Sequence, residues 1–328
     1  MKKILIAFSG CLIIAIGCSK QSVDETNLTA PNVTSLEPSS ISGRCAAHEV
    51  LELQLQQDPK LAARMNAIEE VTAMYLKNPE NYFISNGQVF IPVVFNILYK
   101  TASENISQAQ VQSQVDVLNQ DFSATNPDYN ATPAYFQPVR SGDINVRFIL
   151  DLVVRKSTNK KSWTTNDAMK KSAQGGLDPT NPTTKLNIWV CNMGGGILGY
   201  AQFPGGNAAT DGIVLDDRAT GNTGTAAAPY GLGRTATHEI GHWLNLRHIW
   251  GDATCGNDFV SDTPLHQTSN GGCPAFPKYG SCSATVPMMT MNYMDYTYDA
   301  CMYMFSAGQN SRMNATFLTG GGRTSFAQ

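Results

Sequence analysis

Charged residues are scarce in this 328-residue sequence: only 15% of the side chains are Asp, Glu, Lys or Arg. The formal net charge is −3 and Lys and Arg do not cluster, so the chain lacks the basic surface that nucleic-acid binding requires. Hydrophobic residues make up 42% of the chain, which is enough for a packed core and argues against general disorder. We therefore expect a globular protein that does not bind nucleic acid.

Long apolar runs are also rare. One such run, residues 4–16, follows two lysines at the N-terminus and is too short and wrongly flanked for a transmembrane helix. This layout predicts a secretory signal peptide over residues 1–18. The run ends in Ala-Ile-Gly before Cys18, which resembles the lipobox of bacterial lipoproteins, in which the cysteine is lipidated. An ordinary signal peptide cut nearby is the alternative, and either one predicts export, with the protein lipid-anchored at the outer surface or secreted after processing.

Composition divides the rest of the chain into three segments. Residues 19–43 are rich in Ser, Thr, Asn and Pro and predict a flexible tether. Residues 44–87 have helix-forming composition, and Pro59 is expected to divide them into two helices. Residues 88–328 mix apolar runs with one amphipathic stretch and are expected to form the main domain.

The main domain is predicted to be of the α/β class with a mixed sheet. Ser107 begins a capping box and is followed by apolar residues at helical spacing, which predicts a helix. Strands, a helix, further strands and a second helix in this order are typical of a mixed α/β domain. The predicted strands are residues 89–100, 144–151, 185–193 and 212–217. We expect the last of them, Gly212 to Asp217, to be the edge strand along which an extended polypeptide binds.

Histidine is rare as well, yet three of the five histidines fall within eleven residues. His238 and His242 belong to the pattern HExxH, and residues four apart on a helix share one face, so both imidazoles can bind one ion. Glu239 points beside that ion, where it can polarise a bound water. Zinc suits such a site because it accepts neutral imidazole and needs no redox partner.

The third histidine, His248, requires the chain to reverse direction. A straight helix would carry it roughly 9 Å along the axis from His242, too far to share one ion. Asn245 lies between them, and Asn is the residue after Gly that best tolerates the left-handed conformation ending a helix. The sequence therefore predicts a zinc site made of His238, His242 and His248.

The stretch TATHEIGHWLNLRHIWGD resembles the pappalysins, the branch of the metzincin zinc proteases that includes ulilysin, although metzincins usually have Gly where this chain has Asn245. A second signature, NYMDY, agrees. The resemblance spans roughly residues 44–318 and implies a metzincin fold with an active-site helix. It also implies a Met-turn at Met294 and a Tyr296 hydroxyl near the scissile carbonyl. Neighbouring methionines can be read as core residues: Met288, Met289, Met291, Met302 and Met304.

The cysteines fit an exported protein, because disulfides persist in oxidising compartments. Cys191 lies in an apolar run and is expected to be a buried thiol. Four more crowd into a loop-rich stretch, and three pairings are possible from the sequence alone. The resemblance implies the pairs Cys255–Cys282 and Cys273–Cys301.

Two further sites follow from the resemblance. Arg44-Cys45 resembles the pro-segment motif that keeps some relatives latent, because a thiolate on the zinc displaces the catalytic water; the alternative is a cysteine that is free or pairs between chains. Asp258, Asp262 and Thr263 offer oxygen ligands where relatives bind structural calcium, with Asp258 and Thr263 favoured as side-chain ligands. A polar turn in which Asp caps backbone amides is the alternative there.

These observations predict a zinc-dependent endopeptidase, made as a zymogen, that cleaves internal bonds of proteins or peptides and is inhibited by its own pro-segment. Glu239 would be the general base and Tyr296 a hydrogen-bond donor to the oxyanion. The alternatives are a catalytically inactive zinc-binding surface lipoprotein and a zinc hydrolase of a non-peptide amide. Some pappalysins prefer a basic residue just after the cut; here Met302 and Met304 make an apolar pocket equally compatible with the sequence.

Lipidation of Cys18 is tested by metabolic labelling with palmitate. We expect label in the wild-type precursor and none in a Cys18→Ala variant, since the thiol is the point of attachment. Wild-type labelling no stronger than that of the variant would remove the lipid anchor.

Overall fold

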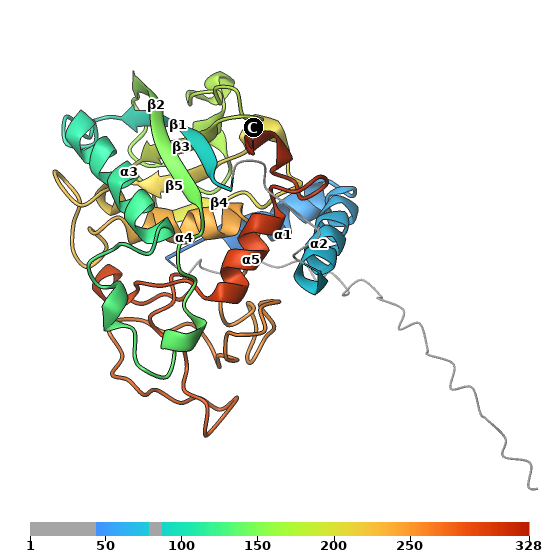
Figure 1. Ribbon diagram of the computed structural model, residues 1–328. Coiled ribbons are helices and arrows are strands. Elements are labelled where there is room, and N and C mark those ends of the chain that lie inside the picture. Colours follow the sequence, from blue (N-terminus) through green and yellow to red (C-terminus); the bar gives the residue numbers. More distant parts are fainter. Residues whose placement is uncertain (1–43, 79–86, 328) are drawn as a thin grey trace, which may run out of the picture. The chain divides into compact units, whose positions relative to one another are not determined.

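The computed structural model describes residues 44–78 and 87–327, which belong to one compact unit, Ile41–Gln328 (Figure 1). The expected signal peptide, its Cys18 and the expected tether lie outside the described residues. Within the described ranges, none of the helices combines the length and the apolar character needed to cross a membrane.

A five-stranded mixed sheet forms the centre of this unit, which confirms the predicted fold class (Figure 1). The strand order is β2-β1-β3-β5-β4, and all neighbours are parallel except β4, which runs antiparallel to β5. Every residue of β3 and β5 is buried, as expected for parallel strands covered on both faces. The strands are β1 (Val89–Tyr99), β2 (Val146–Ser157), β3 (Leu186–Cys191), β4 (Gly199–Ala201) and β5 (Ile213–Asp216).

The predicted edge strand was wrong. Residues 212–217 contain β5, which lies inside the sheet between β3 and β4. The strand at this edge of the sheet is β4, and its three residues are too few to show a strand period in the sequence. The continuous apolar run of β5 fits an interior strand, which is buried on both faces.

The predicted helices are present. Helices α1 (Ala47–Gln57) and α2 (Leu61–Lys77) are separated at Pro59, and Asp58 before the proline is extended, as proline requires of its predecessor. Helix α3 (Gln108–Phe122) begins at Ser107, whose hydroxyl accepts a hydrogen bond from Gln110 N at 3.1 Å. The Gln110 side chain does not complete the capping box; it donates to two backbone carbonyls beyond β5, those of Asp217 and Thr220.

Two hydrophobic clusters hold the layers together. Helix α3 and helix α4 (Arg234–Trp243) pack on one face of the sheet, where β1 contributes alternate residues such as Phe95 and Ile97. The opposite cluster joins Leu98 and Trp189 of the sheet to buried residues of α1 and α2. Helix α2 also packs against α5 (Ala307–Ala315), beside it in Figure 1. The N-terminal helices are therefore part of the folded unit.

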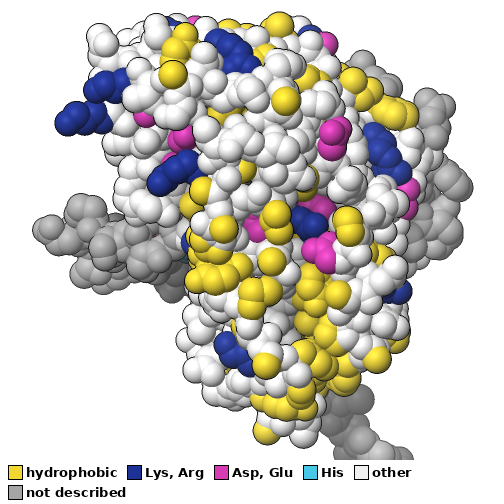
Figure 2. Space-filling view, turned by 90° about the vertical axis from the view of Figure 1, so that its left-hand side faces the viewer, with side chains coloured by type: hydrophobic (Ala, Val, Ile, Leu, Met, Phe, Trp, Pro, Cys, Tyr) yellow, Lys and Arg dark blue, Asp and Glu magenta, His cyan; other side chains and the backbone are white. Residues whose placement is uncertain are grey.

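The long segment after α4 contains no helix or extended strand between residues 251 and 298. It is closed by the disulfides Cys255–Cys282 and Cys273–Cys301, the pairs that the resemblance implies. Loops of this length, closed covalently, gain roughly 3 kcal/mol of stability by restricting the unfolded chain. Hydrophobic side chains gather on the lower half of the face in Figure 2, the half that holds these loops in Figure 1. Cys191 is a buried free thiol, as predicted.

Candidate active site

Three imidazoles converge at the end of helix α4. His238 and His242 lie one turn apart on this helix, which ends at Trp243. Asn245 has φ +71°, so the predicted left-handed reversal is present and returns His248 to the helix. The Nε2 atom of His242 lies 3.1 Å from Nε2 of His238 and 3.1 Å from Nε2 of His248.

The opposite ring nitrogens orient the three imidazoles. Nδ1 of His238 lies 2.6 Å from the carbonyl oxygen of Tyr293, and Nδ1 of His242 lies 2.8 Å from that of Leu246. Nδ1 of His248 lies 2.5 Å from an oxygen of Asp252. Because each acceptor requires a proton on Nδ1, each Nε2 keeps its lone pair for a metal ion. The sequence reasoning did not identify Asp252, although it closes the quoted stretch.

Cys45 completes this group. Its sulfur and the three histidine nitrogens lie within 4.8 Å of one another, and all four side chains are buried. No other set of three or more potential metal ligands of this kind is found within residues 44–78 and 87–327. Ligands of a tetrahedral zinc are about 3.3 Å apart, given zinc bonds of about 2.0 to 2.3 Å. The two 3.1 Å separations between histidine nitrogens are close to this value, and imidazole and thiolate are donors that zinc prefers.

Glu239 lies beside this group and is fully buried. Its Oε2 accepts a hydrogen bond from the Cys45 thiol at 3.4 Å, and its Oε1 has no hydrogen-bond partner among the described residues. Burial raises the pKa of Glu239 to about 8. A Cβ on Gly199 would lie 3.0 Å from the Glu239 carboxylate, so edge strand β4 passes directly beside it.

Tyr296 and Met294 lie next to the histidines and to helix α4. The Tyr296 hydroxyl donates to the carbonyl oxygen of Cys45 at 3.0 Å and lies 3.1 Å from Nε2 of His248. Met294 is buried under α4, and a Cβ on Gly241 would lie 2.4 Å from its sulfur. Position 241, within the HExxH motif, therefore requires glycine, because the Met294 side chain packs against it.

Residues 44–46 pair with the edge of the sheet. The carbonyl of Arg44 accepts a hydrogen bond from Leu198 N at 2.7 Å, and Ala46 N donates to the carbonyl of Gly199 at 3.1 Å. Cys45 and Gly199 form a parallel bridge. Residues 44–46 thus pair with the edge strand, bond to the Glu239 carboxylate and add a sulfur atom to the three histidines at the same time.

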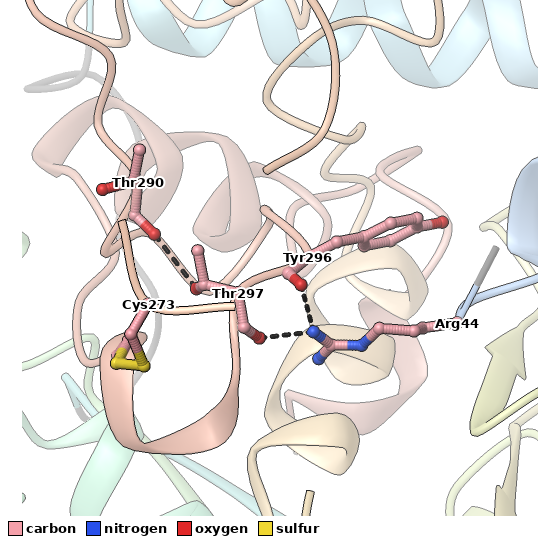
Figure 3. Close-up of a disulfide and its surroundings, with 6 residues drawn as sticks. Arg44, Cys273, Thr290, Tyr296 and Thr297 are labelled. Carbon is pink, nitrogen blue, oxygen red and sulfur yellow. Dashed lines mark hydrogen bonds between the residues drawn. A yellow bond between two sulfur atoms is a disulfide. The ribbon is translucent and has the colours of Figure 1, made fainter. Parts of the chain in front are cut away.

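The side chain of Arg44 points toward the backbone of Tyr296 and Thr297 (Figure 3). Its guanidinium donates to the carbonyl oxygens of Tyr296 and Thr297 and lies 3.9 Å from the ring centre of Tyr230. Asp299 is buried near it: burial raises the pKa of this carboxyl, and the charge of Arg44 opposes that rise. The surroundings of Arg44 thus offer two carbonyl oxygens and an aromatic face to a cation, with a buried carboxylate nearby.

The oxygen-rich turn predicted to bind calcium is held by its own hydrogen bonds. Asp258 accepts from Val260 N at 3.1 Å and from the Thr263 hydroxyl at 2.8 Å. Asp262 accepts from the Ser306 hydroxyl at 2.6 Å and from Gly308 N at 2.7 Å, at the start of α5. The capping arrangement therefore accounts for these contacts.

Comparison with protein families supports this geometry. Residues 200–318 match the family model described as pregnancy-associated plasma protein-A. An extracellular metalloprotease of Verticillium alfalfae is 32% identical over 238 residues, which cover 70% of this chain and 77% of the relative. Extracellular metalloprotease 1 of Coccidioides posadasii is 32% identical over 239 residues, covering 69% of this chain and 75% of the relative.

Solved structures with the same fold include two forms of one protein, mirolysin. Mature mirolysin of Tannerella forsythia, in complex with a cleaved peptide, is 43% identical with a TM-score of 0.70 and covers 74% of this chain and 96% of its own. A variant of promirolysin from the same organism is 39% identical with a TM-score of 0.78 and covers 86% of this chain and 96% of its own.

Proposed function

Because this chain belongs to the pappalysin family of zinc metalloendopeptidases, we propose that His238, His242 and His248 hold its catalytic zinc and that Glu239 is the general base. The observation that carries this proposal is the convergence of the three Nε2 atoms, with successive separations of 3.1 Å, beside a buried carboxylate without a cationic partner at hydrogen-bond distance among the described residues. A purely structural zinc site has no use for that carboxylate.

The residues around the zinc would divide the work of peptide hydrolysis. When bound, zinc lowers the pKa of its water toward neutrality and polarises the scissile carbonyl. Glu239 takes a proton from the attacking water and passes it to the leaving amine. The Tyr296 hydroxyl, now bonded to the Cys45 carbonyl, donates to the developing oxyanion. Edge strand β4 (Gly199–Ala201), in place of the expected 212–217, pairs with the substrate backbone.

Latency would come from residues 44–87, with Cys45 as the fourth zinc ligand. Cys45 of this segment takes the place of substrate at the edge strand and donates a hydrogen bond to Glu239, whose pKa is raised by burial. The match to promirolysin extends over 86% of this chain and the match to mature mirolysin over 74%, which supports a pro-segment of about this size. The expected cut near residues 84–89 falls partly outside the described residues.

Export is supported by the extracellular relatives. A lipid on Cys18 would hold the precursor at a membrane only until the pro-segment is cut, because the protease domain lies on the C-terminal side of that cut.

Intact mass and N-terminal sequence of the leaderless chain test activity and latency together. We expect the wild type to shorten to a species starting near residues 84–89, and Cys45→Ala to shorten faster because its zinc keeps a water. Glu239→Ala should stay intact, since loss of a general base costs about 10²- to 10⁴-fold.

If wild type and Glu239→Ala both stay intact, the outcome depends on a second step. Limited proteolysis with an added protease should then release activity from the wild type alone. No activity after that treatment would favour the inactive zinc-binding lipoprotein.

We propose that the place of the Arg44 side chain takes a basic substrate residue just after the cut. There the Arg44 guanidinium donates to the carbonyl oxygens of Tyr296 and Thr297 and lies over the Tyr230 ring. The sequence left an apolar pocket equally possible; the contacts of Arg44 favour the basic one.

Peptides that differ only in the residue after the scissile bond test this preference. We expect Arg or Lys to exceed Leu in kcat/KM by about ten- to hundredfold, the size of one or two hydrogen bonds to a charged group. Tyr230→Phe should keep the preference and Tyr230→Leu should reduce it, because only the former keeps the aromatic face. Equal rates for Arg and Leu peptides would contradict the proposal.

Structural calcium at Asp258 and Thr263 is likewise a proposal, supported by the burial of Asp258, which raises its pKa to about 6. Calcium at a hundred times its Kd should stabilise the protein by about 2.7 kcal/mol and raise Tm. Asp258→Asn should no longer show a rise of Tm with calcium. Asp262→Asn should have a lower Tm because α5 loses its cap, but calcium should still raise that Tm. If calcium does not change the Tm of the wild type, residues 258–263 are a hydrogen-bonded turn and not a calcium site.

A further inference from the structure

Arg247 has no role in the site described so far, although it directly precedes His248. Its Nε is buried without a hydrogen-bond partner among the described residues, and its guanidinium lies 4.6 Å from the ring centre of Phe203. The Phe203 ring in turn lies 5.3 Å from that of His242. A partly exposed cation therefore lies against an aromatic ring that itself lies beside the His242 imidazole.

A second arginine lies nearby and is bound by the pro-segment. Arg312 of α5 is 2% exposed, and its Nε donates to the carbonyl of Asn245 at 2.9 Å. Its terminal nitrogen bonds to the carboxylate of Glu69 in α2. The same Glu69 oxygen accepts from the side-chain amide of Asn245 at 3.1 Å. The unusual Asn of the zinc motif thus contributes a donor that Gly lacks.

The two arginines are close enough to influence each other. Burial lowers the pKa of Arg247, the charge of Arg312 lowers it further, and the carboxylates of Glu69, Asp252 and Glu52 oppose the change. Of these three acids, Glu69 and Glu52 belong to the pro-segment, in α2 and α1. The zymogen therefore places acidic side chains over a cationic pair of the protease domain.

Removal of the pro-segment takes these glutamates away. Arg312 then loses its carboxylate, and Arg247 loses Glu69 and Glu52 but keeps Asp252 nearby, while both arginines keep their charges. Two guanidiniums and an amide donor match a carboxylate, which accepts several charge-assisted hydrogen bonds. The vacated place of Glu69 is thus a preformed anion site.

The order of the pro-segment contacts indicates where this site lies in the cleft. Arg44 precedes Cys45 and occupies the place proposed above for the residue after the cut. The chain after Cys45 runs the other way, with Gln54 bonded to Gln202 and Arg64 to the carbonyl of Gly205. Glu69 follows these contacts, so its site is on the side of the residues before the cut.

We propose that Arg247, Arg312 and Asn245 form a subsite of the mature protease that binds an acidic side chain of the substrate before the scissile bond, and that Glu69 fills it in the zymogen. This proposal rests on the proposed endopeptidase function. It adds a second specificity element, so that preferred substrates carry an acid before the cut and a base after it.

The test uses enzyme activated from the full chain and peptides with Arg after the scissile bond. In each pair, Glu or Gln occupies one of the four positions before that bond. We expect one position to favour Glu by about tenfold in kcat/KM, as for one charge-assisted hydrogen bond, with the preference falling as salt rises. Arg247→Gln should abolish the preference and Arg247→Glu should turn it toward Lys. Arg147→Gln, a charge change on β2 at the opposite edge of the sheet, should keep it.

Because each variant is compared on its own Glu and Gln peptides, a loss of folded enzyme does not change the ratio. Equal kcat/KM for Glu and Gln at all four positions, or a preference unchanged in Arg247→Gln, would overturn the subsite. Failure of the wild type to cleave any Arg peptide, including the Gln series, would instead refute the endopeptidase function, and the subsite with it.

Discussion

The reversal of the chain at Asn245 is the constraint on which the site depends. Two histidines on α4 come together through helix geometry, but His248 reaches them only because the helix stops and Asn245 takes a left-handed conformation. The turn is held from both sides. Leu246 N donates to the Gly241 carbonyl at 2.9 Å, and Arg312 donates to the Asn245 carbonyl. A residue that resists positive φ at this position would move one of the three histidines away.

The segment after α4 holds the histidines in place through hydrogen bonds and packing. Tyr293 supplies the carbonyl that orients His238, and Met294 packs under the helix. Asp295 accepts hydrogen bonds from the backbone and side chain of Asn270, both at 2.7 Å, which joins the disulfide-closed loop to this turn. The two disulfides therefore restrain a segment that has no helix or extended strand but must hold several active-site groups in place.

The N-terminal segment contacts the site at several points. Its backbone pairs with the edge strand, the Cys45 thiol joins the histidines, Arg44 bonds to the carbonyl of Thr297, and Glu69 bonds to Asn245. Each contact alone is modest, but all are made by one covalent chain, so they reinforce one another. Cutting the chain between the segment and the domain removes that advantage.

The sequence alone determined what local patterns specify. Helical spacing identified α1, α2 and α3, apolar runs identified four of the five strands, and the motif identified His238, His242 and His248 with the turn between them. Resemblance to a family supplied Met294, Tyr296 and the disulfide pairs. Tertiary structure alone decided which strand is the edge, because three residues of β4 carry no period and strand order depends on pairing. It also decided the partners of Arg44, Asp252 and Arg312. Contacts such as that between Glu69 and Arg312, 243 residues apart in sequence, arise only when folding brings distant segments together, and no local pattern records them.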